Sequence, residues 1–232
     1  GLEVKGMVIG QLAAAEAVLT PDERELGVAL LDIGGGTADL AIFERGALWH
    51  TAAIAVGGDH FTNDIAVGLR TPIPEAEKVK RRSGCALSGM VDEDETIEVA
   101  SVGGRRPRVM ARRILSDILQ PRAEELFHLA WDEISKAGYE KSLNSGLVLT
   151  GGGAVLDGLS EIAEQIFDLP MRRGVPVGVG GLADHLSNPA CASALGLVLY
   201  AHRHRQHEPV GVGNGAFTRM VSRLRTVFKE FF

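Results

Sequence analysis

The sequence predicts an α/β fold, on two observations. Short apolar runs such as Val28 to Leu31 and Gly146 to Thr150 are typical of buried strands, and each run leads into a triple glycine. Longer segments with apolar residues three or four positions apart separate these runs and predict helices. With 232 residues, of which 45% are hydrophobic, the chain is long enough to bury a core as one or two domains.

Composition narrows the class of protein. The formal net charge of -6 provides no global basic field, so we expect no nucleic acid partner. Cys85 and Cys191 are too few for a disulfide scaffold, and the lack of a CxxC pair or an export signal favours a reducing cytosol. No apolar run reaches the roughly 18 residues of a membrane span. The chain begins at Gly1 instead of Met, so we expect an N-terminal truncation.

The first predicted element is a helix from Val8 to Leu19, which Thr20 to Glu23 would end. Its small residues would let it pack closely against a neighbouring helix or sheet; they are Ala13, Ala14, Ala15 and Ala17. A packing helix is favoured over a functional hinge.

The first glycine loop joins two predicted strands of a hairpin, Val28 to Leu31 and Leu40 to Phe43. Glycines admit positive φ and leave no Cβ in the way, so their amides can approach phosphate oxygens. Asp32 and Asp39 flank the loop and offer hard oxygen ligands to Mg²⁺, usually through water. The alternative is an ordinary glycine-rich hairpin. The candidate phosphate contacts are Gly34, Gly35, Gly36 and Thr37.

A further strand is predicted from Ala47 to Val56, followed by a helix from His60 to Leu69. Between them, Gly57-Gly58-Asp59 is either a second approach to phosphate or a simple turn. After a proline-containing break, the segment Glu75 to Gly84 predicts a charged helix. On its residues alone, the Glu77 and Lys80 pair is expected to be a solvated surface pair.

The middle of the chain combines a strand, a basic turn and a long helix. The strand is predicted at Thr96 to Val102 and the helix at Met110 to Lys136, whose apolar stripe should face the core. Gln120-Pro121 interrupts the helix and predicts two helices or a kink. The most basic patch of the chain lies here, available to an acidic partner, and comprises Arg105, Arg106, Arg108, Arg112 and Arg113.

The second triple glycine leads into a helix predicted from Leu156 to Phe167. Its backbone could lie flat under a base or ribose; the residues are Gly151, Gly152 and Gly153. A strand is predicted at Val175 to Val179, and Asn188-Pro189 should start a small-residue helix ending at Leu199. The following histidines favour a solvated linker over a zinc site; they are His202, His204 and His207.

The end of the chain predicts an amphipathic helix after a glycine-rich tether at Gly211 to Ala216. Arginine and lysine side chains fill the polar face, so this helix should lie in the headgroup region of an anionic bilayer. A docked core helix is the alternative. The apolar residues proposed to enter lipid are Phe217, Met220, Leu224, Phe228, Phe231 and Phe232.

In order along the chain, these features resemble the FtsA family of actin-like ATPases that act in cell division. The segments that carry the resemblance are Leu12 to Thr20, Glu25 to Asp39, Gly84 to Leu87, Ser101 to Arg105, Leu149 to Gly153 and the terminal amphipathic segment. The first glycine loop alone is shared with actin and Hsp70 relatives, whereas the order of features together with the terminal helix is specific.

The resemblance implies an actin-like (Hsp70/actin ATPase) fold, mainly its second half with an inserted subdomain. It divides the chain into the end of a first actin-like domain with its hinge helix (1–26), subdomain 2A (27–70 and 143–203), subdomain 2B (71–142), a flexible linker (204–216) and an amphipathic membrane-targeting helix (217–232).

The resemblance also implies roles for residues. Asp32 to Thr37 would be the second phosphate loop, Gly151 to Gly153 the adenosine loop, and Glu77 and Lys80 would border the adenosine. Arg112 and Arg113 lie in the subdomain that family members use to hold the C-terminal tail of the tubulin-like protein FtsZ. An arginine patch suits an acidic peptide.

Two departures from the family limit this expectation. The first phosphate loop and the small subdomain of the family precede this sequence, so we expect weak nucleotide binding by this chain alone. Gly10-Gln11 stands where related ATPases orient the attacking water, so no catalytic residue is assigned and the chain is at most a weak ATPase.

The expected function is that of an adaptor in the bacterial division ring. It would bind Mg-ATP, self-associate through actin-like contacts, meet other divisome proteins and anchor FtsZ filaments to the cytoplasmic side of the membrane at the septum. The alternative is another ATPase of the actin fold, either a sugar kinase or a chaperone-like or pilus-assembly relative. For a sugar kinase, no carboxylate that could deprotonate a substrate hydroxyl is apparent.

Overall fold

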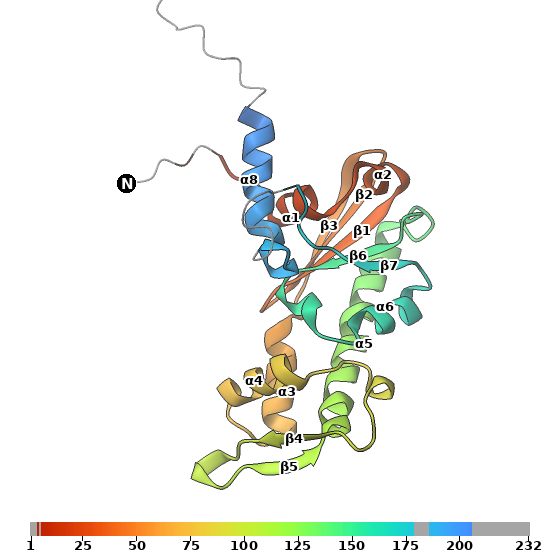
Figure 1. The fold of residues 1–232 in the computed structure, drawn as a ribbon. Coiled ribbons are helices and arrows are strands. Elements are labelled where there is room, and N and C mark those ends of the chain that lie inside the picture. The colour runs from red at the N-terminus through yellow and green to blue at the C-terminus, as the bar shows by residue number, and fades with distance from the viewer. Residues whose placement is uncertain (1–3, 5, 179–185, 206–232) are drawn as a thin grey trace, which may run out of the picture.

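The computed structural model describes residues 4, 6–178 and 186–205 and is built around a five-stranded sheet (Figure 1). The strand order is β3-β2-β1-β6-β7, in which β1, β2 and β3 form an antiparallel meander and β1, β6 and β7 run parallel. The strands are β1 (Val28–Ile33), β2 (Ala38–Glu44), β3 (Ala47–Ile54), β6 (Leu147–Thr150) and β7 (Met171–Arg173).

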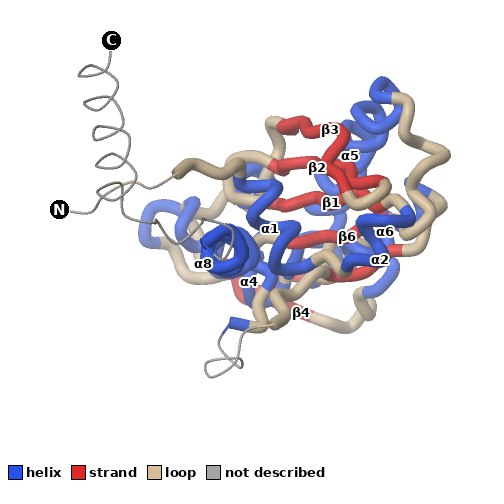
Figure 2. The backbone as a smooth tube through the Cα atoms, turned by 90° about the horizontal axis from the view of Figure 1, so that it is seen from above, coloured by secondary structure: helices blue, strands red, loops and turns tan. Residues whose placement is uncertain are grey.

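Helices cover both faces of this sheet (Figure 2). Successive side chains of a strand point to opposite faces, so Leu30 packs with α1 (Gly10–Val18) and α8 (Ala192–Arg205), whereas Leu31 packs with α5 (Arg112–Ala137) and α6 (Leu159–Phe167). The parallel strands β1 and β6 are buried on both sides and read as continuous apolar runs for that reason.

A second group of elements lies beyond one end of the sheet, around the first half of α5 (Figure 1). It consists of α3 (Gly58–Gly68), α4 (Ile73–Ser83) and the two-stranded sheet of β4 (Thr96–Val99) and β5 (Arg108–Ala111). Arg122 of α5 donates two hydrogen bonds to the Asp64 carboxylate of α3, at 2.6 and 3.0 Å. This forked ion pair fixes α3 against the long helix.

The helices α1 and α8 cross in direct backbone contact. A Cβ on Gly196 of α8 would collide with the Ala13 carbonyl of α1. The alanines predicted to allow close packing are buried here: Ala13, Ala14, Ala15 and Ala17 are fully inaccessible to solvent. At the edge of the crossing Glu16 forms ion pairs with Arg24 and Arg203.

Three elements were predicted wrongly or incompletely. Thr20 to Glu23 does not only end α1 but begins α2 (Pro21–Leu26), because Thr20 and Glu23 form a reciprocal capping box with proline at the first helical position. This signal was readable in the sequence. Of the two alternatives for Gln120-Pro121, two helices or a kink, the first is wrong, because Pro121 lies inside one continuous α5.

The third error concerns Val175 to Val179, for which a strand was predicted. The strand is instead β7 at Met171–Arg173, after which the Gly174 amide donates to Leu149 and the Val177 amide donates to Ala17 of α1. The chain therefore leaves the sheet before the apolar residues that suggested a strand. β5 was not predicted either.

Two further segments differ from the expected outline. α8 continues through His202 and His204 to Arg205, where a linker was expected from residue 204, and no helix within the described ranges is long and apolar enough to cross a membrane. The predicted tether and amphipathic helix at 211–232 lie outside the described residues.

Candidate functional site

The two glycine loops meet at one edge of the sheet. β1 and β6 are parallel neighbours with Asp32 opposite Thr150, so the loops that follow them leave from the same side. Gly151 has φ +86°, and a Cβ there would lie 2.5 Å from the Ile33 carbonyl oxygen and closer still to the Asp32 carboxylate. Only glycine fits this position, and the two predicted loops are in contact through it.

The first loop is a short, exposed hairpin tip. The Gly34 amide donates to the Thr37 carbonyl at 2.9 Å, and Gly35, Gly36 and Thr37 are exposed. None of the three glycines takes the positive φ that glycine admits. The tip is open to an approaching ligand at Gly36, because no atom lies within 4 Å of the place where a Cβ would be.

The Gly57-Gly58 turn supports the first loop from below. A Cβ on Gly57 would lie 2.5 Å from the Gly35 carbonyl oxygen, so the two backbones touch. The amides of Gly58 and Asp59 donate to the carbonyls of Gly34 and Gly35, at 2.9 and 2.8 Å. Because loop carbonyls occupy the first amides of α3, this turn acts as a support and does not present those amides to a phosphate.

The two predicted metal ligands lie side by side across the hairpin. Asp32 and Asp39 are paired in the β1–β2 register. Burial raises the pKa of Asp32, the Asp39 charge raises it further, and a hydrogen bond from Ser193 acts in the opposite direction. Burial also raises the pKa of Asp39. Two such carboxylates attract a cation that relieves their mutual repulsion.

These carboxylates fit Mg²⁺ better than a tightly caged metal. Within the described ranges, no group of three or more His, Cys, Asp or Glu side chains is arranged to hold a metal ion. Mg²⁺ commonly takes one or two carboxylates and completes its octahedron with water and phosphate oxygens. Asp32 and Asp39 are the residues that would hold it, and the ion would neutralise charge on a neighbouring phosphate.

Glu77 and Lys80 form more than a surface pair. Lys80 Nζ lies 2.7 Å from the Glu77 carboxylate and donates to the Gly58 carbonyl and the Thr62 hydroxyl, both at 2.7 Å. The Thr62 hydroxyl donates to Glu77 at 2.5 Å. The Lys80 side chain is only 14% exposed. This network connects α4 with the start of α3, the element that supports the first glycine loop.

The Arg113 guanidinium is more accessible to a partner than that of Arg112. Arg112 donates to the Ser83 carbonyl at 2.8 Å and pairs with Glu95 at 2.7 Å, so its guanidinium holds the fold together. Arg113 is half-exposed and makes one long contact of 3.5 Å with Glu93. Of the two predicted partner residues, Arg113 is the one that an incoming carboxylate can reach.

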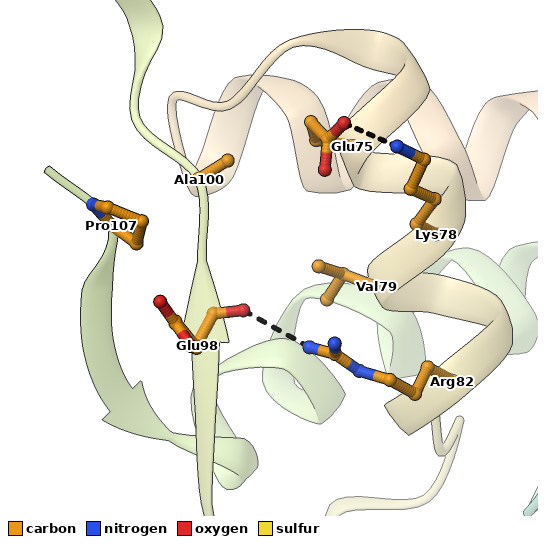
Figure 3. Close-up of a pocket in the computed structure, with 7 residues that line it drawn as sticks. All are labelled: Glu75, Lys78, Val79, Arg82, Glu98, Ala100 and Pro107. Carbon is orange, nitrogen blue, oxygen red and sulfur yellow. Dashed lines mark hydrogen bonds and ion pairs between the residues drawn. The ribbon is translucent and has the colours of Figure 1, made fainter. Parts of the chain in front are cut away.

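A cavity that sequence reasoning did not find lies between α4 and β4 (Figure 3). It has a volume of about 210 Å³, and three of its charged side chains already have partners: Lys78 pairs with Glu75 at 2.7 Å, and Arg82 donates to the Glu98 backbone carbonyl at 3.3 Å. We assign no ligand to this cavity.

Comparisons with known proteins point to one family. A sequence model of the family "Cell division protein FtsA" matches residues 29–196. The cell division protein FtsA of Pseudomonas aeruginosa is 50% identical over 200 residues, which are 86% of this chain and 48% of that protein. The protein of the same name from Escherichia coli K12 is 43% identical over 207 residues, 86% of this chain and 49% of that protein.

Solved structures give the fold. MreB5 of Spiroplasma citri bound to ADP superposes with a TM-score of 0.67 at 21% identity, covering 87% of this chain and 61% of that one. A PilM-PilN type IV pilus biogenesis complex matches with a TM-score of 0.63 at 20% identity, covering 84% and 52%. The fold is therefore actin-like. The chain spans about half the length of the curated relatives that it matches, and it belongs to the FtsA family of cell division proteins.

Proposed function

We propose that this chain forms one wall of a Mg-ATP site in an actin-like adaptor of bacterial cell division, which self-associates and anchors FtsZ filaments to the cytoplasmic side of the membrane. The observation that carries the nucleotide part is the contact between the two glycine loops at Gly151 and Ile33, next to Asp32. Bare backbone on two sides of a carboxylate pair suits a triphosphate with its cation.

Each loop has a separate role in this proposal. Gly34, Gly35, Gly36 and Thr37 contact phosphate oxygens, and Asp32 and Asp39 hold Mg²⁺ through water. Gly151, Gly152 and Gly153 lie against the nucleoside, with Glu77 and Lys80 at its border. Two solved MreB5 structures of the same fold contain ADP and AMPPNP, which supports nucleotide binding by this fold.

The nucleotide site can be tested with a matched pair of substitutions. Neither Gly36 nor Gly89 has an atom within 4 Å of the Cβ position, so aspartate fits at both. Gly36→Asp places a negative charge among the phosphates and should weaken binding of a fluorescent ATP analogue with Mg²⁺ by about tenfold or more. Gly89→Asp should not change it. Equal binding by both variants, or no binding by the unaltered chain at millimolar analogue, overturns the proposed site.

Acidic FtsZ tails are proposed to meet the arginine patch mainly through Arg113. A peptide copying the FtsZ C-terminal tail should bind, and Arg113→Glu should weaken that binding. Lys141→Glu is the control, because it makes the same charge change at an exposed site past the other end of α5. Arg112→Glu would break the contacts with Ser83 and Glu95 and is therefore a poor probe of the partner. Equal loss of binding in the control variant contradicts a local site.

Membrane anchoring is proposed for the segment that follows the described residues. The intact chain should float with vesicles that contain anionic lipid, whereas a chain ending at Pro209 should stay in the soluble fraction. Flotation of both forms would refute the proposal. The FtsA family of the chain also favours this adaptor over a pilus-assembly protein or a sugar kinase with the same fold.

A further inference from the structure

The start of α8 is attached to both glycine loops. Ser193 in its first turn donates a hydrogen bond from its hydroxyl to Oδ2 of Asp32 at 2.7 Å. Just before the helix, the Pro189 carbonyl accepts a hydrogen bond from the Gly151 amide at 3.2 Å. The start of α8 therefore contacts the end of β1 at Asp32 and the first residue after β6, Gly151.

The Asp32 carboxylate needs such a contact in order to keep one orientation. Its cross-strand neighbour Asp39 carries the same charge and repels it. Its other oxygen, Oδ1, lies against the space that a Cβ of Gly151 would fill. The Ser193 hydroxyl donates to the second oxygen, Oδ2, so the two carboxylate oxygens have different surroundings and the carboxylate is held in one orientation.

We infer that Ser193 is a positioning residue for Asp32, and that its hydroxyl sets the strength of Mg²⁺-dependent nucleotide binding at the two glycine loops. This inference rests on the proposed Mg-ATP site. Partners that orient a metal-binding carboxylate typically change metal affinity by about 10- to 100-fold when removed. The same contact ties the site to the α1–α8 crossing, because Gly196 lies one helical turn after Ser193.

The test compares three substitutions in the full chain. Ser193→Ala removes the hydroxyl, Ser193→Thr retains it, and Ser116→Ala removes a buried hydroxyl that has no partner within the described residues. Binding of a fluorescent ATP analogue is measured with Mg²⁺ and with EDTA. Ser193→Ala should reduce the gain in affinity that Mg²⁺ provides by about tenfold, leave binding in EDTA unchanged and be rescued by Ser193→Thr. Ser116→Ala should match the unaltered chain.

A ligand-free measurement separates the two proposals. Hydrogen exchange of the peptide containing Ile33 and Gly34 should be faster in Ser193→Ala, restored in Ser193→Thr and unchanged in Ser116→Ala. If the unaltered chain binds no nucleotide but this exchange pattern appears, the Mg-ATP proposal is wrong while the positioning contact stands. An unchanged Mg²⁺ gain in Ser193→Ala, or exchange equal in all four proteins, overturns the inference.

Discussion

Gly196→Ala tests the closest helix contact in the described part of the molecule. A Cβ built on Gly196 lies 1.7 Å from the Ala13 carbonyl oxygen and 2.4 Å from its carbon, whereas real Cβ contacts essentially never fall below 3.0 Å. Both atoms belong to backbone, so no rotamer change relieves the collision. The crossing of α1 and α8 would have to open by roughly 1.5 Å, which loosens a close-packed interior.

The expected cost follows from two opposing effects. Alanine is favoured over glycine inside a helix by about 1 kcal/mol. Overpacking a core typically costs 1–3 kcal/mol, and a collision between two backbones lies at the upper end or above it. We therefore expect Gly196→Ala to lower the free energy of unfolding by about 2 kcal/mol and the melting temperature by about 4–8 °C for a chain of this size. Urea unfolding followed by circular dichroism measures the first quantity.

The control is Gly10→Ala at the start of α1, where no atom lies within 4 Å of the Cβ position. This variant should be as stable as the unaltered chain. If Gly196→Ala proves equally stable, or more stable, the helices do not cross as closely as described, and the reasoning that connects this crossing to the start of α8 fails with it.

Three further predictions concern stability. Lys80→Met should cost about 1–3 kcal/mol, because the partly buried Glu77 carboxylate and Gly58 carbonyl lose their charged donor. Lys78→Met on the same helix should change stability by less than about 0.5 kcal/mol, and urea midpoints compare the two variants. Burial raises the pKa of Glu23, but hydrogen bonds and charge from Arg172, together with hydrogen bonds from Thr20, outweigh it and hold the pKa below the ordinary 4.5. A carboxyl group whose pKa is lower in the folded state stabilises the fold when the pH is above its pKa in the unfolded chain. The stability lost in Glu23→Gln at pH 7 should therefore shrink as the pH falls below about 4.5. Ser116→Ala should be neutral or slightly stabilising in the same assay, because its buried hydroxyl has no partner in the described part of the chain.

The sequence predicted the centre of the molecule well because the pattern there is local. β1 and β6 are short apolar runs that end at glycines, and parallel neighbours bring such ends to the same edge. The support given by Gly57 and by Ser193 could not be predicted in this way. Gly57 contacts Gly35 across 22 positions of the sequence, and Ser193 contacts Asp32 across 161. The spacing of apolar residues along the chain does not predict contacts between positions so far apart.

Errors in the elements arose where tertiary contacts outweigh the local pattern. The residues Val175 to Val177 are apolar enough for a strand, yet the last bond to the sheet is made by the Gly174 amide, and the Val177 amide donates to Ala17 of α1. α2 has no buried residue, so no amphipathic pattern reveals it. Its cap at Thr20 and Glu23 is local, but the Glu23 carboxylate also accepts two hydrogen bonds from the Arg172 guanidinium, at 2.5 and 2.7 Å, and Arg172 lies 149 positions later in the chain.

The two charged pairs of α4 show that the spacing of charged residues on a helix does not determine how deeply each pair is buried. Glu75 with Lys78 and Glu77 with Lys80 have the same residue types three positions apart, and both pairs close to 2.7 Å. Lys78 is 71% exposed and Lys80 is 14% exposed, because Lys80 faces the Gly58 carbonyl beneath the first glycine loop. The first pair therefore contributes a few tenths of a kcal/mol. The second couples α4 to the loop, and only the fold around it makes the difference.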